Sequence, residues 1–144
     1  MELPEYITKE EVQRVCREIG IRDWTQLSTA TVALEEAKII QEMLGGEAAL
    51  VSTQEFRRGL EVELEHGVTF KDANVTNNHP LLTGKIVKAH LKEMLDYYLR
   101  LEVAELEGDL FKAGVKGDGA KLLLVYQKLV DARMDLCISE KANR

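Results

Sequence analysis

Apolar residues in this chain recur at intervals of three and four, and no segment alternates between apolar and polar residues over the length of a strand. The pattern is clearest after Thr8, which forms a capping box with Glu11 and opens a helix that Gly20 ends. Helical spacing of this kind presents one apolar face for packing against other helices. We therefore predict an all-α fold, a single-domain helical bundle of about five helices over residues 1–144.

Spacing, caps and stops together predict where the five helices lie. The third opens at a second capping box, Ser52 with Glu55, and the fourth carries Pro80 in its first turn. These two helices are expected to form a central helical hairpin over residues 52–107. Four glycines near residue 115 predict a flexible connection before the last helix. The predicted helices span residues 9–19, 31–44, 52–66, 80–107 and 122–138, and the four glycines are Gly108, Gly114, Gly117 and Gly119.

Composition limits the kind of protein this chain makes. A length of 144 residues with 45% hydrophobic and 31% charged residues suits one globular core. No apolar run approaches the ~20 residues of a membrane-spanning helix, and the amino terminus lacks the basic start and apolar core of a secretory signal. The formal net charge of −6 disfavours nucleic acid and anionic lipid surfaces. These features predict a cytoplasmic protein that binds neither nucleic acid nor a membrane.

The two cysteines and the single tryptophan are interpreted as core residues. Cys16 and Cys137 form no Cys-x-x-Cys pair, and both occupy apolar positions of predicted helices, so we expect two buried free thiols. Trp24 lies in the connector after the first helix, where we expect it to pack over the core.

Two carboxylate–imidazole pairs indicate a candidate metal site. Glu63-x-x-His66 ends the third helix, and His90-x-x-Glu93 repeats the pair in reverse order on the fourth. A carboxylate and an imidazole one helical turn apart is the spacing by which ferritin-like bundles hold iron. Nitrogen and oxygen ligands suit a divalent metal such as zinc, iron or manganese. The candidate ligands are Glu63, His66, His79, His90 and Glu93, and no catalytic residue is predicted.

Helix lengths suggest which of these ligands meet. If the two helices pack with their facing ends level, His90 lies ~15 Å along its helix whereas Glu63 is only ~4.5 Å from its end. Glu63, His66 and His79 would then meet most easily. Each residue also has a structural interpretation: His66 complements the negative helix end, His79 caps a helix, His90 is a hydrogen-bonded core histidine, and Glu63 pairs with Arg133.

The polar connection from Gly67 to His79 is longer than most helix–helix loops. Asp72-x-Asn74-x-Thr76 fails as a calcium loop, since its sixth position is not glycine and its twelfth is not glutamate. Thr83-Gly84-Lys85 fails as a phosphate-binding loop, because the first glycine of that motif is replaced by a histidine.

The central hairpin resembles a family of small bacterial proteins of unknown function. The motifs that carry the resemblance are Glu-Leu-Glu-His-Gly (residues 63–67), Thr-Asn-Asn-x-Pro (76–80) and His-Leu-Lys-Glu (90–93), within a match over about Phe56 to Leu101. The family carries an acidic residue where this chain has His79. The resemblance implies a shared fold and a region of interest, and it implies no mechanism.

The last predicted helix carries more apolar surface than one neighbour can cover. Its apolar arc includes nine residues and also encloses Arg133. A helix of this kind lies at the centre of a bundle or meets a second chain. We therefore expect a non-catalytic interaction or adaptor protein, with a protein partner or homodimer bound through the helix within residues 120–138. The alternative is a metal-binding protein or metal-dependent enzyme with its site in residues 63–93.

Overall fold

The computed structural model describes residues 4–142, and within that range the chain forms six α-helices, three short 3-10 helices and no strand. The predicted all-α class is confirmed, with six helices instead of about five. Contacts between Cα atoms divide the chain into two compact units, residues 1–95 and 96–144. The elements are α1 (Lys9–Ile19), η1 (Trp24–Gln26), α2 (Leu34–Leu44), η2 (Gly46–Leu50), α3 (Thr53–Thr69), η3 (Lys71–Ala73), α4 (Pro80–Glu93), α5 (Tyr97–Lys116) and α6 (Gly119–Ala142).

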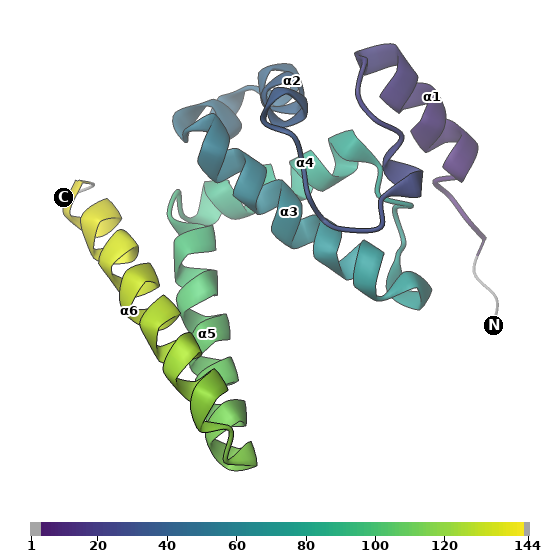
Figure 1. Ribbon diagram of the computed structural model, residues 1–144. Coiled ribbons are helices and arrows are strands. Elements are labelled where there is room, and N and C mark those ends of the chain that lie inside the picture. The colour runs from purple at the N-terminus through teal and green to yellow at the C-terminus, as the bar shows by residue number, and fades with distance from the viewer. Residues whose placement is uncertain (1–3, 143–144) are drawn as a thin grey trace. The chain divides into compact units, whose positions relative to one another are not determined.

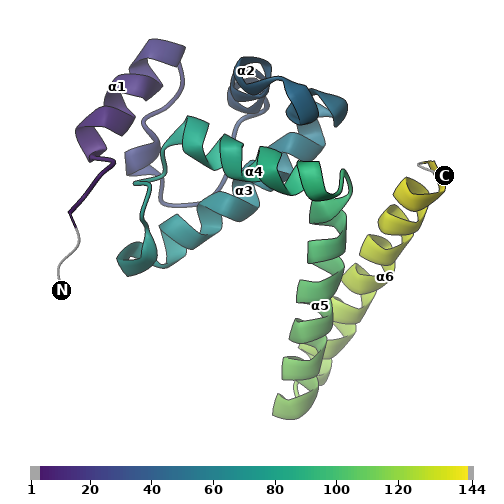
Figure 2. The ribbon, with the colours of Figure 1, turned by 180° about the vertical axis from the view of Figure 1, so that it is seen from behind.

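The amino-terminal unit is built on the packing of α2, α3 and α4 against one another. Helix α3 lies in front of α4 in Figure 1 and behind it in Figure 2, and the two run in opposite directions. Helix α1 packs against η1 and, less extensively, against α4. The result is a layered helical core closed at one side by the α1–η1 segment.

Large apolar side chains fill this core. Trp24, Phe56 and Ile40 have no exposed surface, and burying a side chain of this size contributes roughly 1.5–3 kcal/mol. The predicted packing of Trp24 over the core agrees with its burial. Close approach of α2 and α4 requires Gly84, since a Cβ there would lie 2.6 Å from a methyl group of Leu44.

Capping chemistry explains the helices whose ends were predicted well. Thr8 accepts a hydrogen bond from the Glu11 N–H at 3.2 Å, and Gly20 ends α1 with a φ of 75°. Ser52 and Glu55 form the predicted capping box of α3. These short-range signals act within one turn, so they do not depend on the rest of the fold.

Two predicted boundaries of the central hairpin are wrong. Helix α3 continues through Gly67 to Thr69, because glycine is tolerated inside a helix at a cost of only ~1 kcal/mol. The predicted helix over residues 80–107 is two helices, since Met94 adopts an extended conformation (φ −154°, ψ 130°) after α4. Helix α5 then begins at Tyr97.

The carboxy-terminal unit is an antiparallel pair of long helices. Helix α5 leads away from residue 96 and α6 returns beside it in both views. The predicted glycine-rich connection is wrong over most of its length, because Gly108 and Gly114 lie inside α5 and only Gly117, with a φ of 68°, makes the turn. The buried residues of the two helices are Tyr98, Ala113, Val125, Leu129 and Ala132.

Arg133 and Cys137 lie in environments other than those predicted, whereas Cys16 lies where it was expected. Arg133 is exposed and pairs with Glu107 at 2.7 Å, so it is not a buried partner for Glu63. Cys16 is buried as expected, and burial raises the pKa of its thiol. Cys137 is exposed, contrary to expectation. None of the helices within residues 4–142 is both long enough and apolar enough to cross a lipid bilayer.

Candidate functional site

Glu63 and His90 form a carboxylate–imidazole contact between α3 and α4. The Glu63 Oε1 atom lies 3.5 Å from the His90 Nε2 atom, with the two side chains 14% and 30% exposed. Both side chains are therefore part-buried, and the contact gives His90 a polar partner within the protein. The pair that meets is nevertheless different from the set expected from level helix ends.

The extension of α3 explains the change of partner. Glu63 lies six residues, or ~9 Å, before the end of α3 at Thr69, and not ~4.5 Å as assumed. The connection over residues 70–79 then offsets α4 along α3. These two shifts bring His90 to Glu63 even though His90 lies ten residues into its own helix.

The other three candidate ligands have different surroundings. His66 is exposed in the last turn of α3, where a cation complements the helix dipole. His66 and Glu63 both line a hollow of about 210 Å³ beside Thr83. Glu93 is exposed at the last position of α4. Within residues 4–142, no three His, Cys, Asp or Glu side chains are grouped so that they could hold a metal ion, and metal binding stays a prediction.

His79 caps α4 from a buried position. Its Nδ1 atom accepts a hydrogen bond from the Leu82 N–H at 3.4 Å, and its side chain is almost fully buried. Burial lowers the pKa of His79; the nearby Glu11 carboxylate opposes this, while Arg14 and Lys85 reinforce it. A neutral imidazole is the form that can accept the capping hydrogen bond. The imidazole therefore accepts the N-cap hydrogen bond that an aspartate side chain accepts at other helix starts.

Three asparagines in the connection were missed as site residues. Asn74 donates to the Gly67 carbonyl at 3.1 Å and to the Asn78 side-chain carbonyl at 3.0 Å. Asn78 is buried and donates to the Trp24 carbonyl at 3.4 Å, and Asn77 donates to the Ile7 carbonyl at 2.6 Å. The Asn-Asn dipeptide was a usable signal, since asparagine is enriched in the left-handed region that both residues occupy.

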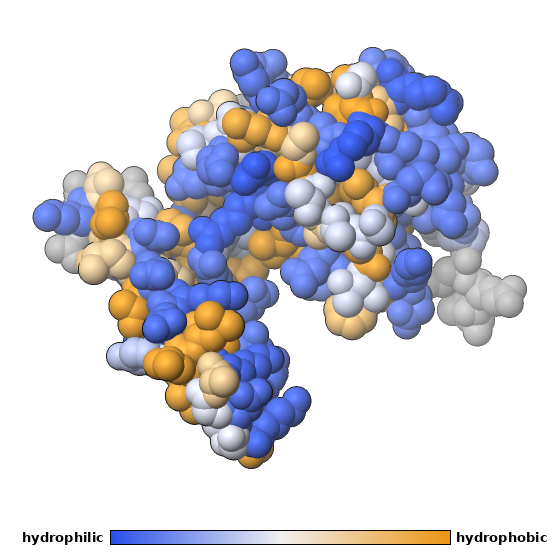
Figure 3. Space-filling model, in the orientation of Figure 1, coloured by the Kyte–Doolittle hydropathy of each residue, from blue (hydrophilic) through white to orange (hydrophobic). Residues whose placement is uncertain are grey.

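A second candidate site is an apolar stripe on α6. Large apolar side chains recur at intervals of three and four residues along this helix and are between 45% and 60% exposed. They lie on a different side of α6 from Val125, Leu129 and Ala132, which face α5. Figure 3 shows hydrophobic surface gathered over the hairpin. The stripe consists of Leu123, Tyr126, Val130, Met134 and Ile138.

Helix α5 also carries exposed apolar side chains, near an ion pair that joins it to α6. Glu107 of α5 pairs with Arg133 of α6, and Phe111 and Val115 follow Glu107 at intervals of four, so they share its side of α5. Phe111 and Val115 are 73% and 72% exposed. Both helices therefore carry exposed apolar side chains, and together these are called here the hairpin face: Phe111, Val115 and the α6 stripe.

Comparison with known proteins gives a family and no activity. Residues 12–107 match the model of a family described as a protein of unknown function, DUF5661. No curated protein and no solved structure gives a significant match. The matched range covers more than half of the chain and ends inside α5, so α6 lies beyond it. The chain belongs to the DUF5661 family.

Proposed function

We propose that this member of the family is a non-catalytic interaction protein that binds a second copy of itself through the hairpin face. The observation that supports the proposal is the exposure of seven large apolar side chains on α5 and α6, those of the hairpin face. Water contact with so many apolar groups is unfavourable, and contiguous apolar patches mark interaction sites.

A second hairpin would cover the apolar stripe that one hairpin leaves exposed. Helix α6 uses one apolar stripe against α5 and leaves the other uncovered. Two such hairpins stacked face to face make a four-helix bundle, in which each helix packs against neighbours on two sides. The stripe spacing of three and four residues suits this packing.

The size of the hairpin face is adequate for a stable pair. Helix α6 has 24 residues, which corresponds to a length of about 36 Å, and two helices side by side are about 20 Å wide. A face of these dimensions offers ~700 Å², close to the ~800 Å² that each partner buries in a standard interface.

Charge also favours a second copy of the chain as the partner. In a two-fold interface the same surface meets itself, so an unbalanced charge would repel its own copy. Residues 96–144 contain eight basic and nine acidic residues, a formal net charge of −1. Several charged groups of the hairpin are paired within it: Glu107 with Arg133, and Arg100 with Asp96 and Glu140.

Light scattering over a concentration series tests this proposal. The wild-type chain is expected to change from monomer to dimer between about 1 and 100 µM, and Leu123→Glu should keep it monomeric because a charge would be buried between the two copies. Leu124→Glu is the matched control, since Leu124 is similarly exposed but one residue off the stripe. A wild-type chain that stays monomeric at about 1 mM, or equal dimerisation of both variants, would overturn the proposal.

A further inference from the structure

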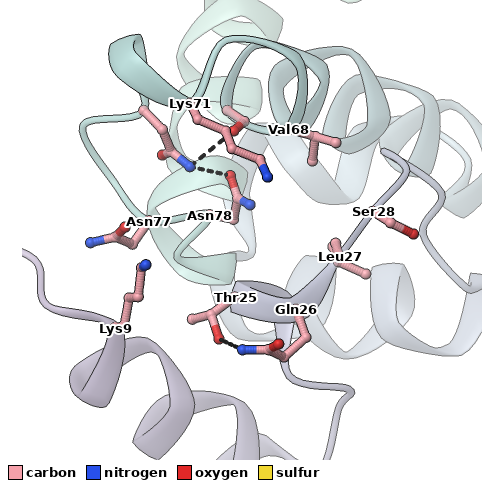
Figure 4. A pocket seen from close by; sticks show the side chains of 11 residues that line it. Lys9, Thr25, Gln26, Leu27, Ser28, Val68, Lys71, Asn77 and Asn78 are labelled. Carbon is pink, nitrogen blue, oxygen red and sulfur yellow. Dashed lines mark hydrogen bonds between the residues drawn. The ribbon is translucent and has the colours of Figure 1, made fainter.

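The amino-terminal unit contains a cavity of about 330 Å³ that the proposed dimer does not use. Its walls come from the start of α1, from η1 and the residues after it, from the end of α3, and from the connection to α4. Figure 4 shows the side chains that line it. A volume of this size lies at the lower end of the range for small-molecule sites.

The cavity is locally basic in an acidic protein. Its lining contains Lys9 and Lys71 and, among the residues that the structure describes, no carboxylate. Residues 1–95 as a whole carry 11 basic and 16 acidic residues, a formal net charge of −5. In Figure 4 the two lysines come from opposite walls, with Asn77 and Asn78 between them in this view. The carboxylate that lies against this lining, Glu5, accepts a hydrogen bond from the Asn77 side chain. The two lysines of the lining itself favour a negatively charged occupant.

Amide groups hold the wall of the cavity in a fixed shape. Asn77 and Asn78 have φ values of 49° and 61°, two consecutive left-handed residues that are not glycine. Such conformations persist where surrounding contacts enforce them, and they cluster at ligand sites. Here the hydrogen bonds of Asn74, Asn77 and Asn78 to neighbouring segments supply the enforcement.

Gly67 is part of the same wall. A Cβ atom at this position would lie 2.3 Å from the Asn78 side-chain oxygen and 3.0 Å from the Asn74 side chain. The glycine therefore lets the amide groups pack directly against α3. A wall that is set before binding costs little ordering on binding.

From these observations we propose that the cavity binds a small polar molecule through an oxyanion group, a carboxylate or a phosphate. Lys9 and Lys71 neutralise the oxyanion, and the amide and hydroxyl groups of the lining, which include Asn78 and Ser28, hydrogen-bond the remainder. The lining has few apolar side chains, Leu27 and Val68 among them, so the ligand is polar rather than aromatic or lipid-like. This inference is independent of the dimer.

A nuclear magnetic resonance titration tests the site with two probes. The full-length chain labelled with ¹⁵N is titrated with inorganic phosphate and, separately, with citrate, each against sodium chloride at equal ionic strength. Saturable shifts are expected at the amides of Lys71, Asn74, Asn77 and Asn78. Saturation by phosphate alone or citrate alone supports the site and identifies the oxyanion, whereas no saturable shift with either probe overturns it.

Matched lysine variants separate the cavity from general surface charge. The double variant Lys9→Gln, Lys71→Gln is expected to bind the effective probe about ten-fold more weakly, because two charge-assisted contacts are removed. Lys71→Arg in place of Lys71→Gln should restore most of the affinity. The control Lys85→Gln, Lys92→Gln removes the same charge from the exposed side of α4. Equal weakening in the control and the test variant would also overturn the site.

Discussion

The two units of this protein bury apolar residues in opposite ways. In residues 4–95 the core is filled by large apolar side chains that have no exposed surface, such as Trp24, Phe56 and Ile40. In residues 96–142 few side chains are buried, and most of these are small or medium-sized, such as Ala113 and Val125, whereas large ones such as Phe111 and Met134 are exposed. A helical unit that covers its own core needs no partner, whereas a two-helix hairpin has only one seam in which to bury side chains. The formal net charge also differs between the units, at −5 for residues 1–95 and −1 for residues 96–144.

Truncation of one phenylalanine in each unit gives the largest expected difference. Phe56→Ala should lower the free energy of unfolding by about 3–5 kcal/mol, because it leaves a cavity among fully packed side chains. Phe111→Ala should change it by less than ~0.5 kcal/mol when the chain is monomeric, since Phe111 is 73% exposed. Urea unfolding at low protein concentration measures both. Equal costs would show that Phe111 is packed within the monomer.

Removal of one arginine in each unit gives the next difference. Arg22 and Arg133 each hold a glutamate at 2.7 Å, but the Glu36 side chain is 7% exposed and the Glu107 side chain 51%. Burial alone would raise the pKa of Glu36, yet Arg22 and the Ala33 and Arg22 N–H groups keep that pKa below its usual range.

Arg22→Ala should therefore cost about 2–3 kcal/mol, because it leaves a buried carboxylate without its cation. Arg133→Ala should cost at most ~1 kcal/mol, as exposed pairs do. Unfolding of the two variants at pH 7 compares them directly, and a smaller loss for Arg22→Ala than for Arg133→Ala would contradict the contrast. A supporting signature is that the Arg22→Ala deficit shrinks as the pH falls and Glu36 becomes protonated.

Replacement of one helical glycine in each unit should change stability in opposite directions. Alanine is favoured over glycine inside a helix by up to ~1 kcal/mol. Gly108 has open space around its Cβ position, so Gly108→Ala should be stabilising. Gly67→Ala should lose about 1–3 kcal/mol, because its Cβ would collide with the asparagine wall. Thermal unfolding of both variants tests this, and a stabilised Gly67→Ala would show that the wall yields easily.

The predictable parts of the fold are those that depend on neighbouring residues in the sequence. The caps at Thr8 and Ser52 and the stop at Gly20 were found because each acts within one helical turn. The break after Met94 was missed, because neither glycine nor proline marks it. Gly67 and Gly108 misled in the other direction, since a permissive backbone allows a helix end without requiring one.

The candidate site was predictable as a region but not as a set of contacts. The polar connection follows from the distance between the two predicted helices, and Glu63 and His90 were both predicted as candidate ligands. The partner of Glu63 depends on how far α4 slides along α3, which the ten-residue connection sets in three dimensions. The Arg22–Glu36 pair joins residues 14 apart with no local pattern. The exposed stripe of α6 was visible as surplus apolar surface, because helical spacing alone reveals it.

Protonation of histidine at acid pH should destabilise residues 4–95 and leave the second unit unaffected. This is the smallest effect expected. All three histidines lie in residues 4–95 and none in residues 96–144. Burial lowers the pKa of His79 in the folded chain below that of the unfolded chain, about 6.5. The unfolded chain then binds more protons as the pH falls, so stability decreases from about pH 6.5 down to the folded pKa of His79 and is regained on returning to neutral pH.

The size of this loss is set by the cap that protonation removes. A protonated Nδ1 atom cannot accept the Leu82 N–H hydrogen bond, and a helix cap is worth about 1 kcal/mol. His79→Asp keeps an acceptor at the same position down to about pH 4, so the pH dependence between 5 and 7 should be smaller in this variant than in the wild type. Hydrogen exchange measured separately for α4 and α6 at pH 7.5 and 5.5, with intrinsic rates corrected for pH, reads the two units independently. The expected result is faster exchange of the α4 amides at pH 5.5 than at pH 7.5 in the wild type. His79→Asp should restore protection of α4 at pH 5.5, and α6 should show no such change. Loss of protection in α6 of the same size would show that histidine protonation is not what distinguishes the two units.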